Sequence, residues 1–510
     1  EYTGLGTMKG RDLQGCRYEP IFPYFAQERP NAFRVLVDDY VTTTEGTGIV
    51  HQAPAYGEDD YRICRAAGIE LVDPLDEDGK FTSAVPDWEG EFCKDADKGI
   101  IRHLKQVGKL VQQSTIVHSY PFCERTDTPL IYRAIDAWYV RVEDLRERLL
   151  RSNSQIRWMP DYVGEKRFAN WLAEAKDWNI SRNRFWGSCL PLWINVEDPD
   201  DIICVGSIAE LEALSGVKVD DLHKHYIDQI EIHREGKTYR RTPEVLDCWF
   251  ESGSMPYAQH HYPFENKEKV EATFPAEFIA EGLDQTRGWF YTLVVLSTIL
   301  FDKPAFLNVV VNGLVLAEDG RKMSKRLKNY PDPMEVINQY GADALRLCML
   351  SSPVVRAEDL RFSETAVREV MRTVLLPIWN SYSFLATYAR VDNWRPAPGA
   401  LSYPCNPANV LDRWILSRLT ATVADFRTAL DAYDLQKGAT RFTSFIEDLT
   451  NWYIRRSRRR FWKSSNDQDK EEAYQTLYYV LVSFCQLAAP FIPFITETIY
   501  RDLRTEDMPE

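Results

Sequence analysis

The chain has 510 residues and a formal net charge of −15, with 45% hydrophobic and 13% aromatic residues. This composition excludes a disordered chain, and the acidic balance argues against a general nucleic-acid coat protein, so an RNA site would have to be a local basic patch. A chain of this length is too long for one hydrophobic core and predicts about three domains.

Residues 1 to about 155 contain short alternating stretches, such as FRVLVDDYVTTT, and one helical pattern at DADKGIIRHLKQVGKLV. These patterns predict a β-rich mixed domain. In the segment EGTGIVHQAPAYGEDDY, Gly46 and Gly48 open a predicted strand that ends near His51, and a turn then delivers Asp60. His51 and Asp60 could hold an ammonium group and a water molecule, although a histidine that follows a strand is more often structural.

From about 156 to 363 the pattern changes to strands that feed helices. AEFIAEG and NVVVNGLVL are typical of buried strands, and the apolar segment TRGWFYTLVVLSTILF between them is typical of a helix. Repeated strand-to-helix units predict a parallel α/β sheet, with the polar stretch at about 195–240 as a surface insertion. From 364 to 510 the helical periodicity predicts a bundle.

The segment EGLDQTRGWF follows the first of these strands. It puts Glu281, Gly282, Asp284 and Gln285 at the carboxyl edge of the sheet, where doubly wound folds bind ligands. A carboxylate there can take an ammonium group, glycine allows close approach of a ligand, and the amide suits a ribose or an amino group. The alternative is an ordinary helix start with Asp284 as the N-cap.

The loop GRKMSKRLKN, 320–329, follows the second strand. Lys322 and Lys325 offer point charges to a phosphate chain, and Ser324 can donate a hydrogen bond. The alternative for a lysine-rich loop is an exposed basic hairpin.

Two tryptophans and two arginines lie beside polar loops elsewhere in this part of the chain. Trp249 and Trp289 could wall an apolar pocket, although packing in the core is the usual role of a single tryptophan. In DWNISRNRFWG, Arg182 and Arg184 can bind anions or pair with carboxylates. The histidine pair at 260–261 has no third ligand at useful spacing, which favours a surface pair over a metal site.

A basic helix is predicted at NWYIRRSRRRFWK, 451–463. Arginine can grip phosphates and stack on unpaired bases, as RNA recognition requires, whereas the alternative is a solvated basic face. The candidate RNA-binding side chains are Arg455, Arg456, Arg458, Arg459 and Arg460.

Together these segments resemble the class I aminoacyl-tRNA synthetases. Lys-Met-Ser-Lys matches their signature loop, and Glu-Gly-x-Asp-Gln-x-Arg-Gly-Trp-Phe and Ser-Arg-x-Arg-x-Trp-Gly match the isoleucine, valine and leucine branch. Gly-Thr-Gly-x-Val-His-x-Ala-Pro resembles the editing pocket of the isoleucine and valine members. SGSMPYAQHHYPFEN, KMSKRLKNYPDP and SYPFCERTDTPLIYRA resemble most closely the isoleucine-specific members of the eukaryotic cytoplasmic type. Arg326 and Lys328 depart from the lysine-loop pattern of the valine members, which favours isoleucine over valine.

The resemblance implies a multidomain α/β fold. It consists of an editing domain at 1–155, the second half of a Rossmann catalytic core at 156–363, and a helical anticodon-binding domain at 364–510. The implied catalytic residues are Lys322, Ser324 and Lys325, and His51 and Asp60 would edit mischarged valine. Implied contacts to ATP or the aminoacyl adenylate are Glu281, Gly282, Asp284, Gln285, Trp249 and Trp289, and the five arginines would bind tRNA.

The resemblance also sets expectations for partners and location. It implies ATP with Mg²⁺, L-isoleucine and the tRNA for isoleucine as substrates, and it allows membership of a multi-synthetase complex. The ten cysteines never occur as Cys-x-x-Cys, so no bound zinc is expected. Scattered cysteines and the lack of an apolar run of 18 residues favour a soluble cytoplasmic protein with neither membrane nor DNA as a partner.

None of the eight histidines forms His-x-Gly-His, the other ATP signature of the family. We therefore expect an internal segment of a longer enzyme, lacking the first half of the Rossmann fold and the C-terminus and unable to activate an amino acid alone. Alternatives are a valine-specific member and a tRNA-binding relative that has lost catalysis. A metal-dependent nucleotidyl transferase would leave the editing and arginine-rich segments unexplained.

Overall fold

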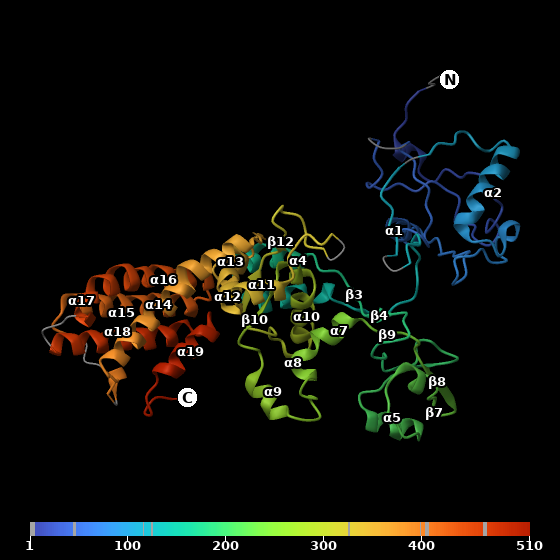
Figure 1. Ribbon diagram of the computed structural model, residues 1–510. Coiled ribbons are helices and arrows are strands. Elements are labelled where there is room, and N and C mark those ends of the chain that lie inside the picture. Colours follow the sequence, from blue (N-terminus) through green and yellow to red (C-terminus); the bar gives the residue numbers. More distant parts are fainter. Residues whose placement is uncertain are drawn as a thin grey trace. The chain divides into compact units, whose positions relative to one another are not determined.

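The computed structural model describes residues 6–43, 47–115, 117–123, 126–324, 327–397, 399–402, 407–462 and 467–509. The chain divides into two compact units, Glu1–Asp136 and Ala137–Glu510. Figure 1 follows the chain from blue at the N-terminus to red at the C-terminus.

The first unit contains two α-helices, α1 (Glu58–Ala66) and α2 (Cys93–Gln106). Its described residues pair through isolated bridges rather than extended strands: Arg17 with Arg34, Leu75 with Phe81, Lys80 with Phe92 and Phe122 with Pro129. This differs from the strands expected here. In the alternating segment FRVLVDDYVTTT, the apolar Val37 is 44% exposed, so no sheet covers it. Alternation gives a stable strand only where one face is buried.

A parallel sheet forms the centre of the second unit. Its strands are β2 (Arg157–Met159), β10 (Ile279–Gly282) and β11 (Asn308–Asn312), in the order β10-β11-β2. Helix α10 (Trp289–Phe301) connects β10 to β11 and is apolar on nearly all sides, as a helix enclosed by the core must be. The predicted parallel α/β core of the Rossmann type is confirmed.

Further short elements surround this sheet. The helices α3 and α4, which come before and after β2 in the chain, pack in the core of this sheet, and two strand pairs, β1 with β3 and β12 with β13, lie outside it. Their bounds are β1 (Tyr139–Val140), α3 (Arg146–Ser154), α4 (Ala169–Ala173), β3 (Trp178–Asn179), α7 (Cys248–Gly253), α8 (Met255–Ala258), α9 (Lys267–Thr273), β12 (Val315–Leu316) and β13 (Leu360–Arg361).

A second, antiparallel sheet lies between β4 (Ser181–Arg182) and β9 (Val245–Leu246), which pair with each other. Its strands have the order β6-β5-β8-β7, and they enclose a small core around Trp193 and Ile232. Its elements are β5 (Leu192–Asn195), β6 (Ile202–Cys204), α5 (Ile208–Ser215), α6 (Lys224–Ile227), β7 (Ile232–Arg234) and β8 (Lys237–Arg241). The polar stretch of the sequence is therefore a subdomain with its own apolar core.

The rest of the second unit is helical, which confirms the predicted bundle (Figure 1). Helices α11 and α12 share its core, and the buried carboxylate of Asp343 in α12 accepts hydrogen bonds from the first amides of α19 at Phe494 and Ile495. The helices are α11 (Pro333–Tyr340), α12 (Ala342–Leu350), α13 (Glu364–Val370), α14 (Leu376–Val391), α15 (Val410–Asp431), α16 (Leu435–Glu447), α17 (Arg455–Trp462), α18 (Asp467–Ala488) and α19 (Pro493–Leu503).

Among the residues that the structure describes, no helix combines the length and the apolar character that crossing a membrane requires.

Candidate functional site

One sequence motif leaves the parallel sheet at its carboxyl edge, and a second follows β12, one strand further along the chain than the sheet. Strands β10 and β11 run parallel, and Gly282 at the end of one pairs with Asn312 at the end of the other. The loop after β10 carries Asp284 and Gln285, and the loop after β12 carries Lys322. Carboxyl ends of parallel strands are where such sheets bind ligands, so Asp284 and Gln285 leave β10 on the expected side. The lysine loop leaves the carboxyl end of β12, which runs parallel to β13.

The chain turns from β10 into a short 3-10 helix, Leu283–Arg287, before α10 begins. Glu281 and Asp284 are exposed, and a Cβ added at Gly282 would lie 2.6 Å from Oδ1 of Asp284. The Asp284 carboxylate therefore folds back close to the strand end at Gly282. The two carboxylates therefore remain open to a cationic or hydroxyl-bearing ligand.

Gln285 fixes the start of α10. Its Oε1 accepts a hydrogen bond from the amide of Trp289 at 2.9 Å, and its Nε2 donates to Asp284 at 3.4 Å. One of the free amides at a helix start is thereby satisfied. The helix-start alternative assigned this role to Asp284, but the structure gives it to Gln285.

Trp249 and Trp289 meet across Gly288. The indole Nε1 of Trp289 donates to the carbonyl of Ser252 in α7 at 2.9 Å, and a Cβ at Gly288 would lie 3.2 Å from Cη2 of Trp249. Trp249 is 40% exposed, so part of its ring is free to contact a ligand. Trp249 thus forms a partly exposed aromatic wall next to Gly288, and Trp289 is hydrogen-bonded to α7.

Asp247, which the sequence analysis passed over, connects this wall to the arginine motif. Its side chain is buried, caps α7 through the amide of Trp249, pairs with Arg182 at 2.9 Å and accepts from Nε1 of Trp178 at 3.1 Å. An aspartate directly before a helical Cys-Trp-Phe-Glu-Ser pattern is an N-cap signal that could have found it. Of the two motif arginines, Arg182 has this structural partner.

A cavity of about 1320 Å³ opens beside these residues. Trp249, Asp247 and Glu251 line one part of it, and Arg184, Trp186 and His223 line another. A space of this size, with a few polar groups on mainly apolar walls, has the character of a ligand site.

The lysine loop is held by Asn329. Its Oδ1 accepts from the amide of Ser324 at 2.9 Å, and its Nδ2 donates to the carbonyl of Lys322 at 3.0 Å. Lys322 also makes an antiparallel bridge with Leu316 of β12, and its side chain is exposed. Lys325 lies outside the described residues. After Asp247, Asn329 is the second residue that the sequence analysis did not predict. Its signal is that asparagine side chains often bind nearby backbone groups in turns.

His51 and Asp60 lie in the first unit. Asp60 is in the first turn of α1, and its Oδ2 accepts from the amide of Ala53 at 2.9 Å, two residues after the exposed His51. Burial raises the pKa of Tyr40, and the charge of Asp60 adds to the rise. The carboxylate thus lies against the segment that carries His51, although no contact joins the two side chains among the described atoms.

The predicted RNA-binding arginines separate into two groups. Arg455, Arg456, Arg458 and Arg459 are exposed on α17, and Arg456 lies over the ring of Trp452 at 5.6 Å. Arg460 is different, because its side chain is only 11% exposed.

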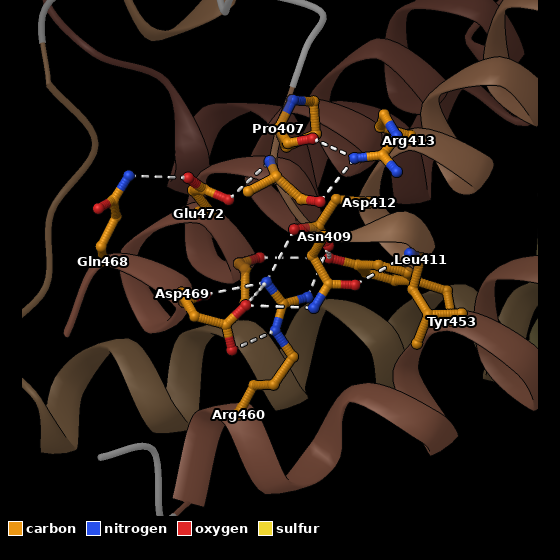
Figure 2. Close-up of polar contacts among 12 residues, drawn as sticks. Pro407, Asn409, Leu411, Asp412, Arg413, Tyr453, Arg460, Gln468, Asp469 and Glu472 are labelled. Carbon is orange, nitrogen blue, oxygen red and sulfur yellow. Dashed lines mark hydrogen bonds and ion pairs between the residues drawn. The ribbon is translucent and has the colours of Figure 1, made fainter. Parts of the chain in front are cut away.

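Arg460 is tied into the bundle by carboxylates of two other helices. Figure 2 shows its guanidinium between Asp412, at 2.7 and 2.8 Å, and Asp469, at 2.8 and 3.0 Å. Tyr453 donates a further hydrogen bond to Asp412 at 2.8 Å. Burial opposes the charge of Arg460, yet its hydrogen bonds with these carboxylates raise its pKa above the ordinary value. Arg460 therefore holds α17 against α15 and α18, and the other four arginines of the predicted set remain exposed.

No group of three or more histidine, cysteine, aspartate or glutamate side chains in the described ranges is arranged to hold a metal ion.

Comparison with known proteins adds family evidence to this geometry. Residues 44–361 match the family model of tRNA synthetases class I (I, L, M and V), and residues 412–510 match that of the anticodon-binding domain of tRNA ligases. The first match covers more than half of the chain.

Curated relatives match along the chain. An isoleucine–tRNA ligase of Protochlamydia amoebophila is 54% identical, with 100% of this chain and 49% of the relative covered. That of Bdellovibrio bacteriovorus is 55% identical, with 98% and 47% covered. The chain spans about half the length of the curated relatives it matches. Because these relatives are bacterial, the expected eukaryotic type is corrected to a bacterial-type match.

A solved structure supports the fold. The methionyl-tRNA synthetase of Mycobacterium tuberculosis, in complex with methionyl-adenylate, aligns with a TM-score of 0.54 at 17% identity. The alignment covers 86% of this chain and 79% of that one. At this identity the likeness concerns the fold alone.

Proposed function

The chain belongs to the class I tRNA synthetases, the family of the isoleucine, leucine, methionine and valine enzymes, and from this premise we propose that the protein is an isoleucine–tRNA ligase. It would activate L-isoleucine with ATP and transfer it to the tRNA for isoleucine. The observation that carries the proposal is the carboxyl edge of the parallel pair β10 and β11, from which the Asp284–Gln285 turn leaves directly and the chain continues through β12 to the lysine loop.

In the activation step, the isoleucine carboxylate attacks the α-phosphorus of ATP, and pyrophosphate leaves. Glu281 takes the α-ammonium of isoleucine, and Asp284 and Gln285 take the ribose or the adenine amino group. Trp249 and Trp289 wall the aliphatic side chain. Lys322, with Ser324 and Lys325, stabilises the negative charge that grows on the leaving pyrophosphate, and Mg²⁺ enters with ATP.

The closed backbone of the lysine loop supports this role. Asn329 binds the amide of Ser324 and the carbonyl of Lys322, so the backbone that carries the Lys322 ammonium has a fixed position. A charge that is already in place stabilises a transition state without the cost of reorganisation.

The first unit would carry editing. An apolar pocket separates isoleucine from valine by one methylene, which is worth only about 1–3 kcal/mol. This magnitude is the known one for the isoleucine enzyme and explains why a second, hydrolytic site is needed. Asp60 would bind the α-ammonium of a misattached valine, with His51 beside it.

We further propose the domain limits 1–155 for editing, 156–363 for the catalytic core and 364–510 for anticodon binding. Arg455, Arg456, Arg458 and Arg459 would contact tRNA phosphates, since their guanidinium groups are exposed on one helix. A protein that charges tRNA acts where translation takes place, which makes the cytoplasm its proposed location.

Charging of tRNA tests the proposal. The intact gene product that contains this chain is incubated with ATP, radiolabelled isoleucine and a transcript of the isoleucine tRNA. We expect acid-precipitable label on this transcript and none on a valine tRNA transcript. Charging of the valine transcript with radiolabelled valine, or no charging of either transcript, would refute the proposal.

A separate assay tests editing. In the Asp60→Ala variant of the same gene product, we expect valine to accumulate on the isoleucine tRNA, while isoleucine charging is unchanged. Asp59→Ala, which removes a neighbouring exposed carboxylate of α1, is the matched control. Wild-type deacylation by Asp60→Ala would exclude the assigned role.

A further inference from the structure

Helix α7 carries Trp249, and Asp247 holds the first turn of this helix. Oδ1 of Asp247 accepts from the amide of Trp249 at 3.3 Å, and the carbonyl of Asp247 accepts from the amide of Phe250 at 2.8 Å. Each bond satisfies one of the first amides of the helix. Because α7 has only six residues, its own hydrogen bonds contribute little, and contacts with the rest of the fold must order it.

The other carboxylate oxygen of Asp247 faces the strands that come before the antiparallel subdomain. Oδ2 pairs with the guanidinium of Arg182 in β4 at 2.9 Å and accepts from Nε1 of Trp178 in β3 at 3.1 Å. The amide of Asp247 donates to the carbonyl of Ile180, between these two strands, at 2.7 Å. Only 4% of the Asp247 side chain is exposed, so these contacts are shielded from water. A buried carboxylate that accepts from an arginine and an indole is firmly held.

The far end of α7 is packed against α10. The carbonyl of Ser252 accepts from Nε1 of Trp289 at 2.9 Å, and a Cβ added at Gly253 would lie 3.0 Å from Cβ of Thr292. The helix is therefore held at its start by Asp247 and at its end by α10. Trp249 comes between these two attachments in the chain.

Part of Trp249 is free to contact a ligand. The residue is 40% exposed, and Cη2 of its ring would lie 3.2 Å from a Cβ added at Gly288. Trp249 and Asp247 both line the cavity described above. A ring on a frayed helix would take many orientations, whereas a ring on an ordered helix is in place before the ligand arrives. Such ordering lowers the entropy lost on binding.

We infer that Asp247 is a positioning residue for isoleucine, because it holds Trp249 in the orientation that packs against the aliphatic side chain of the amino acid. The carboxylate acts through α7 and its ring. The inference rests on the proposed function, which assigns Trp249 to the wall of the isoleucine pocket. Without Asp247, a smaller fraction of the molecules has an ordered α7, and the apparent affinity for isoleucine falls by that fraction.

ATP–pyrophosphate exchange by the intact gene product measures the effect on isoleucine. In Asp247→Ala we expect the KM for isoleucine to rise about fivefold or more, with kcat and the KM for ATP within about twofold of the wild type. Asp247→Asn keeps the size of the side chain and the cap oxygen but brings an amide nitrogen next to two donors. Its KM for isoleucine should rise about twofold or more, which decides the question if the alanine variant does not fold.

A double variant shows whether Asp247 acts through Trp249. In a Trp249→Ala background, Asp247→Ala should change the KM for isoleucine less than about twofold, because the ring that Asp247 positions is already gone. A general weakening of the fold would raise the KM by the same factor in both backgrounds. That result, or a wild-type KM for isoleucine in both Asp247 variants, would overturn the inference.

Asp434→Ala is the matched control. Asp434 caps α16 through the amide of Lys437 at 3.1 Å and lies 3.8 Å from Arg356, so it is also an N-cap aspartate beside an arginine. Its loss removes a similar contact from the helical bundle, and the KM for isoleucine should stay at the wild-type value. A similar rise in this variant would contradict a specific role of Asp247.

Amide hydrogen exchange, followed by mass spectrometry of the intact gene product, separates this inference from the proposed function. Amides of 248–253 should exchange about fivefold or more faster in Asp247→Ala than in the wild type, while those of α16 stay unchanged. If the wild type showed no isoleucine-dependent pyrophosphate exchange, the proposed function would fail, whereas faster amide exchange would still support the positioning of Trp249. Wild-type amide exchange at 248–253 in the variant would overturn the inference by itself.

Discussion

Lys322 occupies a position that its neighbours determine. Asn329 binds the backbone on both sides of Met323, and the bridge to Leu316 joins Lys322 to the strand that leads into the loop. The exposed ammonium thus extends from a fixed backbone, whereas a lysine of a free loop would have to be ordered first.

Replacement of Lys322 tests this role. In the intact gene product, Lys322→Ala should lower isoleucine-dependent ATP–pyrophosphate exchange about 100-fold or more, because one cation at a developing charge is lost. Lys328→Ala is the matched control, since Lys328 is also exposed in this loop, and it should retain most of the exchange. Similar activities of the two variants would contradict the assignment to Lys322.

Single residues also show what the sequence could and could not predict. The sequence motifs predicted Gln285, Trp249 and Lys322 as candidate site residues, because each belongs to a motif whose chemistry can be inferred from its own residues. Asp247 and Asn329 were not identified, since their importance comes from their partners. For Asp247 these partners, Trp178 and Arg182, come from distant parts of the chain.

Among the elements, the basic helix α17 depends on a buried charge. Asp412 in α15 is fully buried and binds Arg460 with both oxygens, while Asp469 in α18 binds the same guanidinium (Figure 2). The exposed arginines of α17 are therefore presented from a helix anchored on two others. The sequence analysis grouped Arg460 with them because a helical pattern does not reveal which arginine has a buried carboxylate opposite it.

Asp412→Ala should destabilise the bundle by about 3–5 kcal/mol, because it leaves the Arg460 charge buried with part of its pairing removed. Urea unfolding followed by helical circular dichroism measures the change. Arg459→Ala, an exposed change on the same helix, should stay within about 0.5 kcal/mol of the wild type. A wild-type midpoint for Asp412→Ala would show that the buried pair does not anchor α17.

The antiparallel subdomain has a pH-dependent contact of its own. Asp201 accepts hydrogen bonds from Lys237 at 2.7 Å, Asn195 at 3.0 Å and Tyr239 at 2.9 Å. These contacts, with Lys237 first, lower the pKa of Asp201 from 3.8 to about 2. Because the folded pKa is depressed, the contact stabilises the fold above pH 3.8 and is lost as the pH falls toward 2.

Amide hydrogen exchange in β5 and β8 tests this contact. Asp201→Asn should exchange faster than the wild type above pH 4, and the difference should shrink between pH 4 and pH 2. Asp198→Asn, at the neighbouring turn, is the control and should follow the wild type. A difference that stays constant across this range would contradict the lowered pKa of Asp201.

For the whole molecule, sequence patterns predicted the parts whose structure is set locally. Helical periodicity identified the bundle, and apolar strands followed by helices identified the parallel sheet of β10 and β11. The first unit was harder, because alternation in 33–44 predicts a strand only if another strand covers its apolar side. Among the described residues of Glu1–Asp136 such a partner is absent, and isolated bridges occur instead.

The central claim of the proposed function is that the intact gene product activates isoleucine. ATP–pyrophosphate exchange by the intact gene product, with isoleucine and valine compared at equal concentrations, tests it most directly. The account predicts exchange with both amino acids and a kcat/KM about 10- to 200-fold higher for isoleucine, the discrimination that one methylene allows. Exchange that favours valine, or none with either amino acid, would contradict it.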